Sequence, residues 1–144
     1  MPYYGLTMHA EPKKLWLEAL RSEKYPQYTD GALVAFEQLS DHQTKLCGFC
    51  CLGVFGVIEG LHTIGSTTKL RAGSRGKPME GMLREKWFSQ FFDWDKKLYT
   101  DDEKYEHSYP TKLGAIDKAQ GKLSDMNDEG KPFPDIANWI EANL

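Results

Sequence analysis

The chain contains no long hydrophobic run, and none of its apolar stretches approaches the 18 or more residues that a membrane-spanning helix requires. The N-terminal residues MPYY are not a basic region followed by an apolar stretch, so no secretory signal is expected. Acidic residues slightly outnumber basic ones, and the net charge of -3 argues against a generic binder of nucleic acid. We therefore expect a cytoplasmic protein that does not bind membranes.

Neither a repeat nor a low-complexity linker divides the 144 residues. A chain of this length buries roughly 68–70% of its unfolded surface, so no metal or disulfide is needed to hold it together. Four Trp, seven Tyr and seven Phe exclude disorder throughout the chain. We expect residues 1–144 to form a single globular domain.

Cysteine is scarce and confined to Cys47, Cys50 and Cys51. An odd number of cysteines so close together cannot link distant parts of a fold, which excludes a disulfide framework. Cys47 and Cys50 have the CxxC spacing of a thiol redox site, and with His42 and His62 they could supply four zinc ligands. Free cysteines in an apolar segment are more often only buried, so we predict no metal site.

Apolar residues recur at helical spacing near both ends of the chain: Leu15, Trp16, Ala19 and Leu20 at one end, and Phe133, Ile136, Trp139 and Ile140 at the other. This spacing predicts amphipathic helices over residues 12–22 and 134–143. Pro12 and Pro134 suit the first turns of these helices. The second helix should follow a turn over residues 127–130, which read NDEG.

The middle of the chain is harder to assign. Four glycines in the apolar run 47–61 allow close packing, and we expect a buried Gly/Cys-rich helix over residues 48–60. Aromatic residues at helical spacing predict a further helix over 80–94, with its rings in the core. Residues 32–39 fit either a strand or a helix. The predicted fold class is α+β, with N- and C-terminal amphipathic helices, the buried central helix and a small antiparallel sheet.

Three blocks of sequence occur in a characteristic order. They are residues 15–22 (LWLEALRS) with Tyr25, residues 49–54 (FCCLGV), and residues 126–130 (MNDEG) followed by 133–141 (FPDIANWIE). This order resembles a group of small proteins of unassigned function encoded by tailed bacteriophages. The chain departs from the pattern at Pro132, where Ser or Thr would cap the last helix, and residues 63–112 have no counterpart. The resemblance implies a viral accessory protein in the cytoplasm of the bacterial host, and it carries no established activity.

Charge is segregated along the chain. Residues 66–86 carry a local net charge of +4, whereas residues 93–106 carry -3 and residues 125–141 carry -4. Within the basic region, GSTTK and GSRGK offer backbone donors next to a cation, which are the elements of an anion-binding nest. Neither stretch is a P-loop, because Pro78 follows Lys77 where Ser or Thr would bind Mg²⁺. An ATPase is therefore disfavoured.

The sequence predicts instead a passive site for a small phosphorylated, nucleotide-like ligand. Four cations are expected to neutralise the phosphate: Lys69, Arg71, Arg75 and Lys77. Two tyrosines of the loop 25–31, Tyr25 and Tyr28, are expected to stack on a base. A solvated basic loop without a ligand is the alternative. The four histidines have no fixed carboxylate or nucleophile partner in the sequence, and HExxH and GxSxG are absent. We therefore favour a protein that is not an enzyme and has no cofactor.

Two functions fit a phage accessory protein. In the first, the protein counters host defence by sequestering a small nucleotide-like signal without catalysis. In the second, it is an inhibitor that docks on a host protein through its acidic surfaces or the aromatic residues 87–94. Exposed rings at Trp87, Phe91 and Trp94 would favour the second function, and buried rings would remove that anchor. Either function is compatible with a homo-oligomer.

Overall fold

Five α-helices, two short 3₁₀ helices and five strands occur in the described part of the chain. The computed structural model describes residues 2–40, 43–60, 67–71, 82–99 and 110–144, and the backbone alone for residues 38, 44 and 67–71. In chain order the elements are η1 (Tyr3–Gly5), β1 (Leu6–Met8), α1 (Ala10–Arg21), β2 (Val34–Ser40), β3 (Gln43–Phe49), α2 (Cys51–Ile58), β4 (Thr67–Arg71), α3 (Glu85–Ser89), β5 (Phe92–Trp94), η2 (Lys96–Leu98), α4 (Lys112–Asp128) and α5 (Phe133–Asn143).

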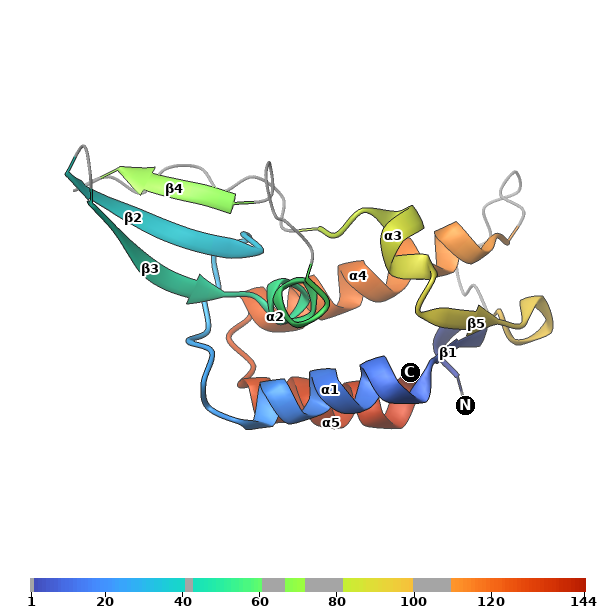
Figure 1. Cartoon of the computed structure of the whole chain (residues 1–144). Helices are drawn as coiled ribbons and strands as arrows, with labels where there is room; N and C mark the ends of the chain where they lie inside the picture. Colours follow the sequence, from blue (N-terminus) through green and yellow to red (C-terminus); the bar gives the residue numbers. More distant parts are fainter. Residues whose placement is uncertain (1, 41–42, 61–66, 72–81, 100–109) are drawn as a thin grey trace.

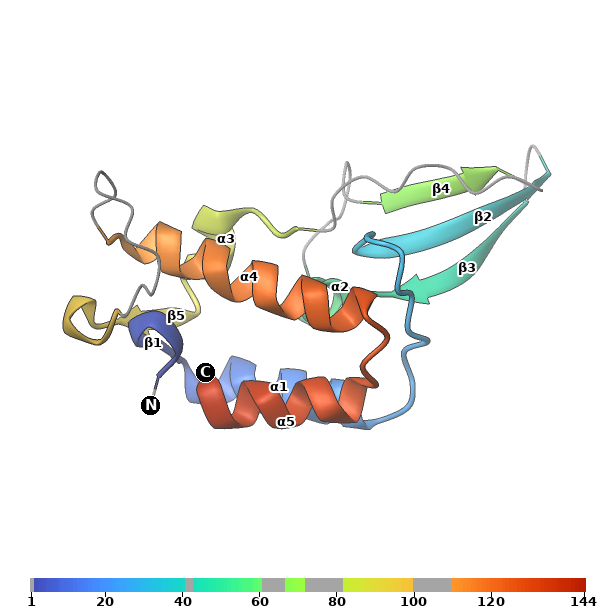
Figure 2. The ribbon, with the colours of Figure 1, turned by 180° about the vertical axis from the view of Figure 1, so that it is seen from behind.

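The helices form two layers between two small sheets. The helices α1 and α5 lie side by side and antiparallel in one layer, and α2 and α4 pack over them (Figure 1). The sheet of β2, β3 and β4 extends from one end of these layers, and the β1–β5 pair lies at the other end (Figure 2). Both termini lie at the β1–β5 end, where the amide of Met8 donates to the carbonyl of Leu144 at 2.7 Å. None of the helices in the described ranges is long and apolar enough to cross a membrane.

The two sheets differ in their pairing. Strands β1 and β5 are antiparallel, in a register that places Leu6 opposite Trp94. In the three-stranded sheet the order is β3-β2-β4, with β2 and β3 antiparallel and β4 parallel to β2. The predicted α+β class is thus confirmed, with small antiparallel pairings and one parallel pairing. The sequence left residues 32–39 open between strand and helix, and most of this segment lies in the central strand β2.

The core is centred on aromatic rings from three helices and one strand. Trp16, Phe55, Phe88 and Phe92 are each less than 2% exposed. The ring of Phe55 lies 4.9 Å from that of Trp16 and 5.2 Å from that of Phe88, between centroids. Tilted and edge-on pairs of this kind add about 0.5–1.5 kcal/mol each beyond the burial of apolar area. The core therefore ties α1, α2 and α3 together.

The helix predicted over residues 80–94 is wrong in its extent. Of the described residues 82–94, only Glu85–Ser89 is helical, and the chain then enters β5, where Phe92 is buried and Asp93 is exposed. The aromatic residues follow a helical spacing by chance, because backbone pairing with β1, more than 80 residues away, decides the local structure. The rings themselves pack on the core as expected.

The helix predicted over residues 48–60 is confirmed in its centre but begins later, at Cys51. Residues 48 and 49 are instead the end of β3, where the amide of Phe49 donates to the carbonyl of Pro26 at 2.7 Å. Gly48 has a φ of +154°, and a Cβ there would lie 2.7 Å from that carbonyl. Glycine is therefore needed where β3 meets the loop 25–31.

Candidate functional site

A buried asparagine at the end of α4 joins three segments of the chain. The Oδ1 atom of Asn127 accepts hydrogen bonds from the amide of Cys51 at 3.2 Å and from Nε2 of Gln27 at 3.1 Å. Its Nδ2 atom donates to the carbonyl of Tyr28 at 2.8 Å. Asn127 is completely buried, and burial of an amide is tolerated only when its donors and acceptors find partners in this way. It fixes the loop 25–31 and the start of α2 on α4.

The neighbouring contacts of Cys51 extend this polar cluster. The indole Nε1 of Trp16 donates to the carbonyl of Cys51 at 2.9 Å, and both residues are buried. The Sγ atom of Cys50 accepts from the amide of Gly53 at 3.3 Å and so caps α2. Residues from all three blocks that carry the phage resemblance thus meet at the start of α2. Their contacts stabilise the fold, a role that the sequence analysis did not assign to them.

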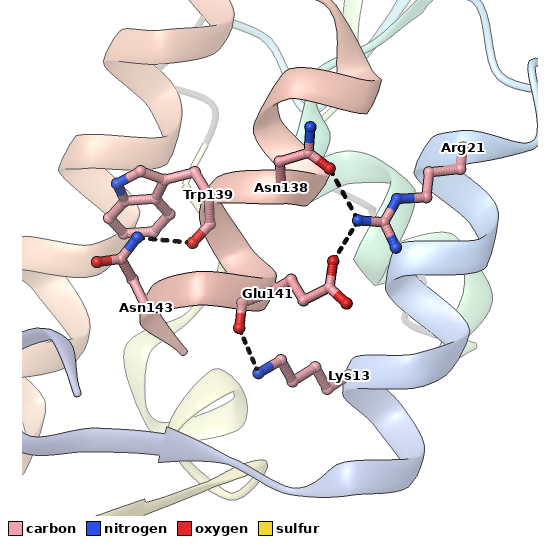
Figure 3. Close-up of polar contacts among 6 residues, drawn as sticks. All are labelled: Lys13, Arg21, Asn138, Trp139, Glu141 and Asn143. Atoms are coloured by element: carbon pink, nitrogen blue, oxygen red, sulfur yellow. Dashed lines mark hydrogen bonds and ion pairs between the residues drawn. The ribbon is translucent and has the colours of Figure 1, made fainter. Parts of the chain in front are cut away.

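A second cluster holds α1 against α5 (Figure 3). The guanidinium of Arg21 donates to Oδ1 of Asn138 at 2.9 Å and pairs with the carboxylate of Glu141. The Nζ atom of Lys13 donates to the backbone carbonyl of Glu141 at 3.1 Å. The hydrogen bond and the charge of Arg21 lower the pKa of Glu141, so this carboxyl is ionised at neutral pH. Both partners of the pair are largely exposed, and solvent screens their attraction.

An open groove of about 670 Å³ runs along α1 beside this cluster. Its lining comes from one face of α1 and the last turns of α5: Ala10, Lys13, Lys14, Leu17, Glu18, Arg21, Ser22 and Glu141. Three of these residues are cationic, and the largely buried Leu17, 9% exposed, is the apolar residue between them. The groove is the site that sequence reasoning missed. The spacing of Lys14, Leu17 and Arg21 on one helix face was the signal for it.

These positions belong to a recognised sequence family. A family model described as "Domain of unknown function (DUF8296)" matches residues 8–144. The chain belongs to this family. No curated protein and no solved structure matches the chain. The DUF8296 match includes the Asn127 cluster, the groove and the basic region 66–86.

The basic residues predicted from the sequence fall in or after β4. Lys69 pairs in register with Phe36 and Arg71 with Gln38, so both lie in an outer strand of the sheet. Arg75 and Lys77 lie outside the described residues. Among the cations of the expected site, the backbone positions of Lys69 and Arg71 are therefore the ones that can be placed.

The two tyrosines of the expected site lie elsewhere in this DUF8296 member. The ring of Tyr25 packs edge-on against Phe49, with 5.4 Å between centroids, and the amide of Tyr28 donates to the carbonyl of Phe49. Gln27 forms an isolated β-bridge with Phe49, so the loop lies next to β3. Strand β4 lies on the far side of β2. Three strand spacings of about 4.8 Å separate the loop from β4, roughly 14 Å in all. The structure does not bring the tyrosines and β4 together.

The cysteines are placed for packing. Burial raises the pKa of the Cys50 thiol to about 12 and that of Cys51 well above its ordinary value, so both stay protonated at neutral pH. Cys47 is half-buried in the extended strand β3. His42 and His62, the other two candidate zinc ligands, lie outside the described residues. Within the ranges that are described, no group of three or more His, Cys, Asp or Glu side chains could hold a metal.

The thiols should therefore react in two classes. In the native protein at pH 8, a chromogenic disulfide reagent should modify Cys47 within minutes, while Cys50 and Cys51 should react only after denaturation, because burial excludes the reagent and keeps them protonated. Spectrophotometric titration would count one accessible thiol per native chain and three in guanidinium chloride. Cys47→Ser should abolish the native reaction. Two or three rapidly reacting native thiols would contradict the structure.

The aromatic residues 87–94 are engaged inside the protein. The ring of Trp87 lies 5.7 Å from that of Phe55 and 5.1 Å from that of Phe91. The indole Nε1 of Trp94 donates to the carbonyl of Tyr4 at 3.0 Å. These three aromatic residues of the segment are only partly buried, but their contacts are with the core. The rings are thus neither fully exposed nor fully buried, and docking on a host protein through them stays a prediction.

Proposed function

We propose that the protein binds a small phosphorylated, nucleotide-like ligand without catalysis, and that the basic segment from β4 onward forms the site. The observation that carries this proposal is the placement of Lys69 and Arg71 in an outer strand, followed after short intervals by Arg75 and Lys77. Guanidinium and ammonium groups are the side chains that bind phosphate through charge-assisted hydrogen bonds. The local charge of +4 in an acidic chain supports an anionic ligand.

The ligand is bound by this segment and not by the tyrosines of the loop 25–31. Tyr28 lies beside β3, at the edge of the sheet opposite β4. Its amide donates to the carbonyl of Phe49, and its carbonyl accepts from Asn127. Base recognition by Tyr25 or Tyr28 would require a ligand long enough to cross two strands. We therefore assign the affinity to phosphate contacts, with Lys69, Arg71, Arg75 and Lys77 as the binding residues.

The proposed biological role is counter-defence by a bacteriophage in the cytoplasm of its host. The resemblance of the three sequence blocks to phage accessory proteins supports this role. Sequestration needs tight binding and no turnover, which agrees with a site made of cations without a catalytic base. In the described part of the chain, His9 and Asp93 are the one His–carboxylate pair, at 3.2 Å, and both are exposed at the surface.

The test is binding of a panel of linear and cyclic nucleotides, measured by native mass spectrometry and by thermal shift. A ligand at about a hundred times its Kd stabilises the folded state by roughly 2.7 kcal/mol, which raises Tm by about 5–10 °C for a chain of this size. Arg71→Ala with Arg75→Ala should abolish the adduct and the shift while the Tm without ligand stays unchanged. The charge-matched control is Lys122→Ala with Lys131→Ala, two exposed lysines on other elements. No adduct across the panel, or equal loss in the control, would refute the proposed site.

A further inference from the structure

We propose that the groove along α1 binds an acidic amphipathic helix of a partner protein. This is a second site, away from Lys69 and Arg71 in β4 (Figure 1), and it does not depend on a phosphorylated ligand.

The length and shape of the groove favour a helix over a small molecule. Its lining extends along α1 from Ala10 to Ser22, which is about 18 Å at the rise of an α-helix. That is the length of about three turns of a partner helix. Lys14, Leu17 and Arg21 follow one another at intervals of three and four residues, so they lie in one line on the surface of α1. A helix recognises such a line with side chains at the same spacing.

The charges in the groove define the chemistry of the partner. The ammonium group of Lys14 makes no hydrogen bond or ion pair with the described residues and is available to a carboxylate. Lys13 donates to the backbone carbonyl of Glu141, and its charge also attracts the Glu141 carboxylate, whose pKa it helps to lower. Arg21 is paired with the carboxylate of Glu141, so these two charges offset one another. The remaining acid in the lining is Glu18, and the groove keeps a net positive charge on a protein whose total charge is -3.

The partner that fits has carboxylates on both sides of an apolar residue. Of two glutamates or aspartates seven residues apart, one would approach the unpaired Lys14, and the other would share the guanidinium of Arg21 with Glu141 and Asn138. A leucine, isoleucine or methionine midway between them would lie over Leu17, where the groove is apolar. Leu17 packs in the core and leaves 9% of its surface exposed in the groove, so the partner would contact it without displacing it. The surface is on a different face of the fold from β4, so both partners could bind at once.

The experiment uses a fluorescein-labelled helical peptide with two glutamates seven residues apart and leucines between them, and measures anisotropy with the full chain. Lys14→Glu should weaken binding at least tenfold, and raising the salt concentration should weaken it further because the attraction is electrostatic. Lys14 is exposed and unpaired within the described residues, so this change should leave Tm unaltered. Lys122→Glu on α4 makes the same change of charge away from the groove and should bind the peptide like the original chain. A peptide with lysines in place of the glutamates should not bind.

Three outcomes would overturn the proposal. The first is no binding of the acidic peptide by the original chain, and the second is equal loss of binding in Lys14→Glu and Lys122→Glu. The third is a dimer, seen by light scattering, that Lys14→Glu dissociates and the peptide does not, since the occupant of the groove would then be a second copy of the chain. None of these outcomes bears on nucleotide binding, which the Arg71 and Arg75 changes test separately.

Discussion

Gly53→Ala is expected to lower the free energy of unfolding by more than about 3 kcal/mol, a large part of the stability of an ordinary domain. A Cβ at this position would lie 1.8 Å from the backbone carbonyl oxygen of Leu33, far inside van der Waals contact. That oxygen cannot move freely, because it accepts the amide of Cys50 at 3.1 Å where the chain enters α2. Relief of the clash would require α2 to withdraw from Leu33, the residue before β2, which would open the aromatic core around Phe55.

The matched control is Gly121→Ala in α4. A Cβ at Gly121 has no heavy atom within 4 Å, so the same chemical change meets open space. Alanine is favoured over glycine inside a helix by up to about 1 kcal/mol, and this variant should be slightly more stable than the original chain. Urea denaturation followed by circular dichroism would place the two midpoints on opposite sides of that of the original chain. A midpoint for Gly53→Ala equal to the original one would show that α2 does not approach the carbonyl of Leu33 as described.

The terminal helices could be predicted from the sequence because their pattern is local. The apolar stripe at residues 15–20 packs α1 on α2 and α5, and the stripe at residues 133–140 packs α5 on α1 and α4. Their periodicity survives in the fold except at Leu15, which is 46% exposed. The bounds shift by a few residues, since α1 begins at Ala10 and α5 at Phe133.

The helix α4 was not predicted, although its apolar residues recur at helical spacing: Ala115, Ile116, Ala119, Leu123 and Met126. Two of these residues are alanines, and Gly114 and Gly121 lower the helix propensity of the segment. Tertiary contacts compensate for this. The side chain of Thr111 caps the first turn by accepting the amide of Gly114, and the buried amide of Gln120 pairs with both the amide and the carbonyl of Leu83. The pairing of Gln120 joins positions 37 residues apart, and no local pattern indicates it.

The same distinction applies to the candidate sites. A cluster of cations such as Lys69 to Lys77 is visible in the sequence because its residues are neighbours in the chain. The separation of Tyr28 from β4 is not visible, because it follows from the order of strands in the sheet. The groove combines α1 with Glu141, more than a hundred residues later, and its charge balance depends on the pair that Arg21 makes there. Sequence reasoning finds sites made by one segment and misses sites made by two.

Asn127→Ala is the second change with a large expected effect, a loss of about 2–4 kcal/mol in the free energy of unfolding. The change removes the acceptor of the Cys51 amide and the donor to the Tyr28 carbonyl. A buried backbone group left without a partner costs about 1–3 kcal/mol, and the Cys51 amide lies in a site that is closed to solvent. Gln27 loses one of the two acceptors of its Nε2 atom, which still donates to the carbonyl of Lys131 at 2.7 Å. Thermal and urea denaturation would measure the loss.

Asn127→Asp separates the hydrogen-bond role of this side chain from its packing. The introduced carboxylate keeps two acceptor oxygens for the amide of Cys51 and for Gln27, but it cannot donate to the carbonyl of Tyr28 while it is ionised. Burial disfavours the charge, as it already raises the pKa of the adjacent Asp128, so the introduced carboxyl should have a higher pKa in the folded state than in the unfolded chain.

The sign of the resulting pH dependence follows from linkage. Because the pKa of the introduced carboxyl is higher in the folded state than in the unfolded chain, the deficit of Asn127→Asp in the free energy of unfolding, relative to the original chain, is largest at neutral pH. It shrinks as the pH falls through the folded-state pKa, because the protonated carboxyl regains a donor for Tyr28. Asn127→Ala introduces no titrating group, and its loss of stability should change less between pH 7 and pH 4 when each variant is compared with the original chain at the same pH. The change that remains comes from Asp128, whose pKa the side chain of Asn127 lowers through a hydrogen bond. Parallel losses for both variants across this range would mean that the side chain only fills space, and that the loop 25–31 is held to α4 by packing alone.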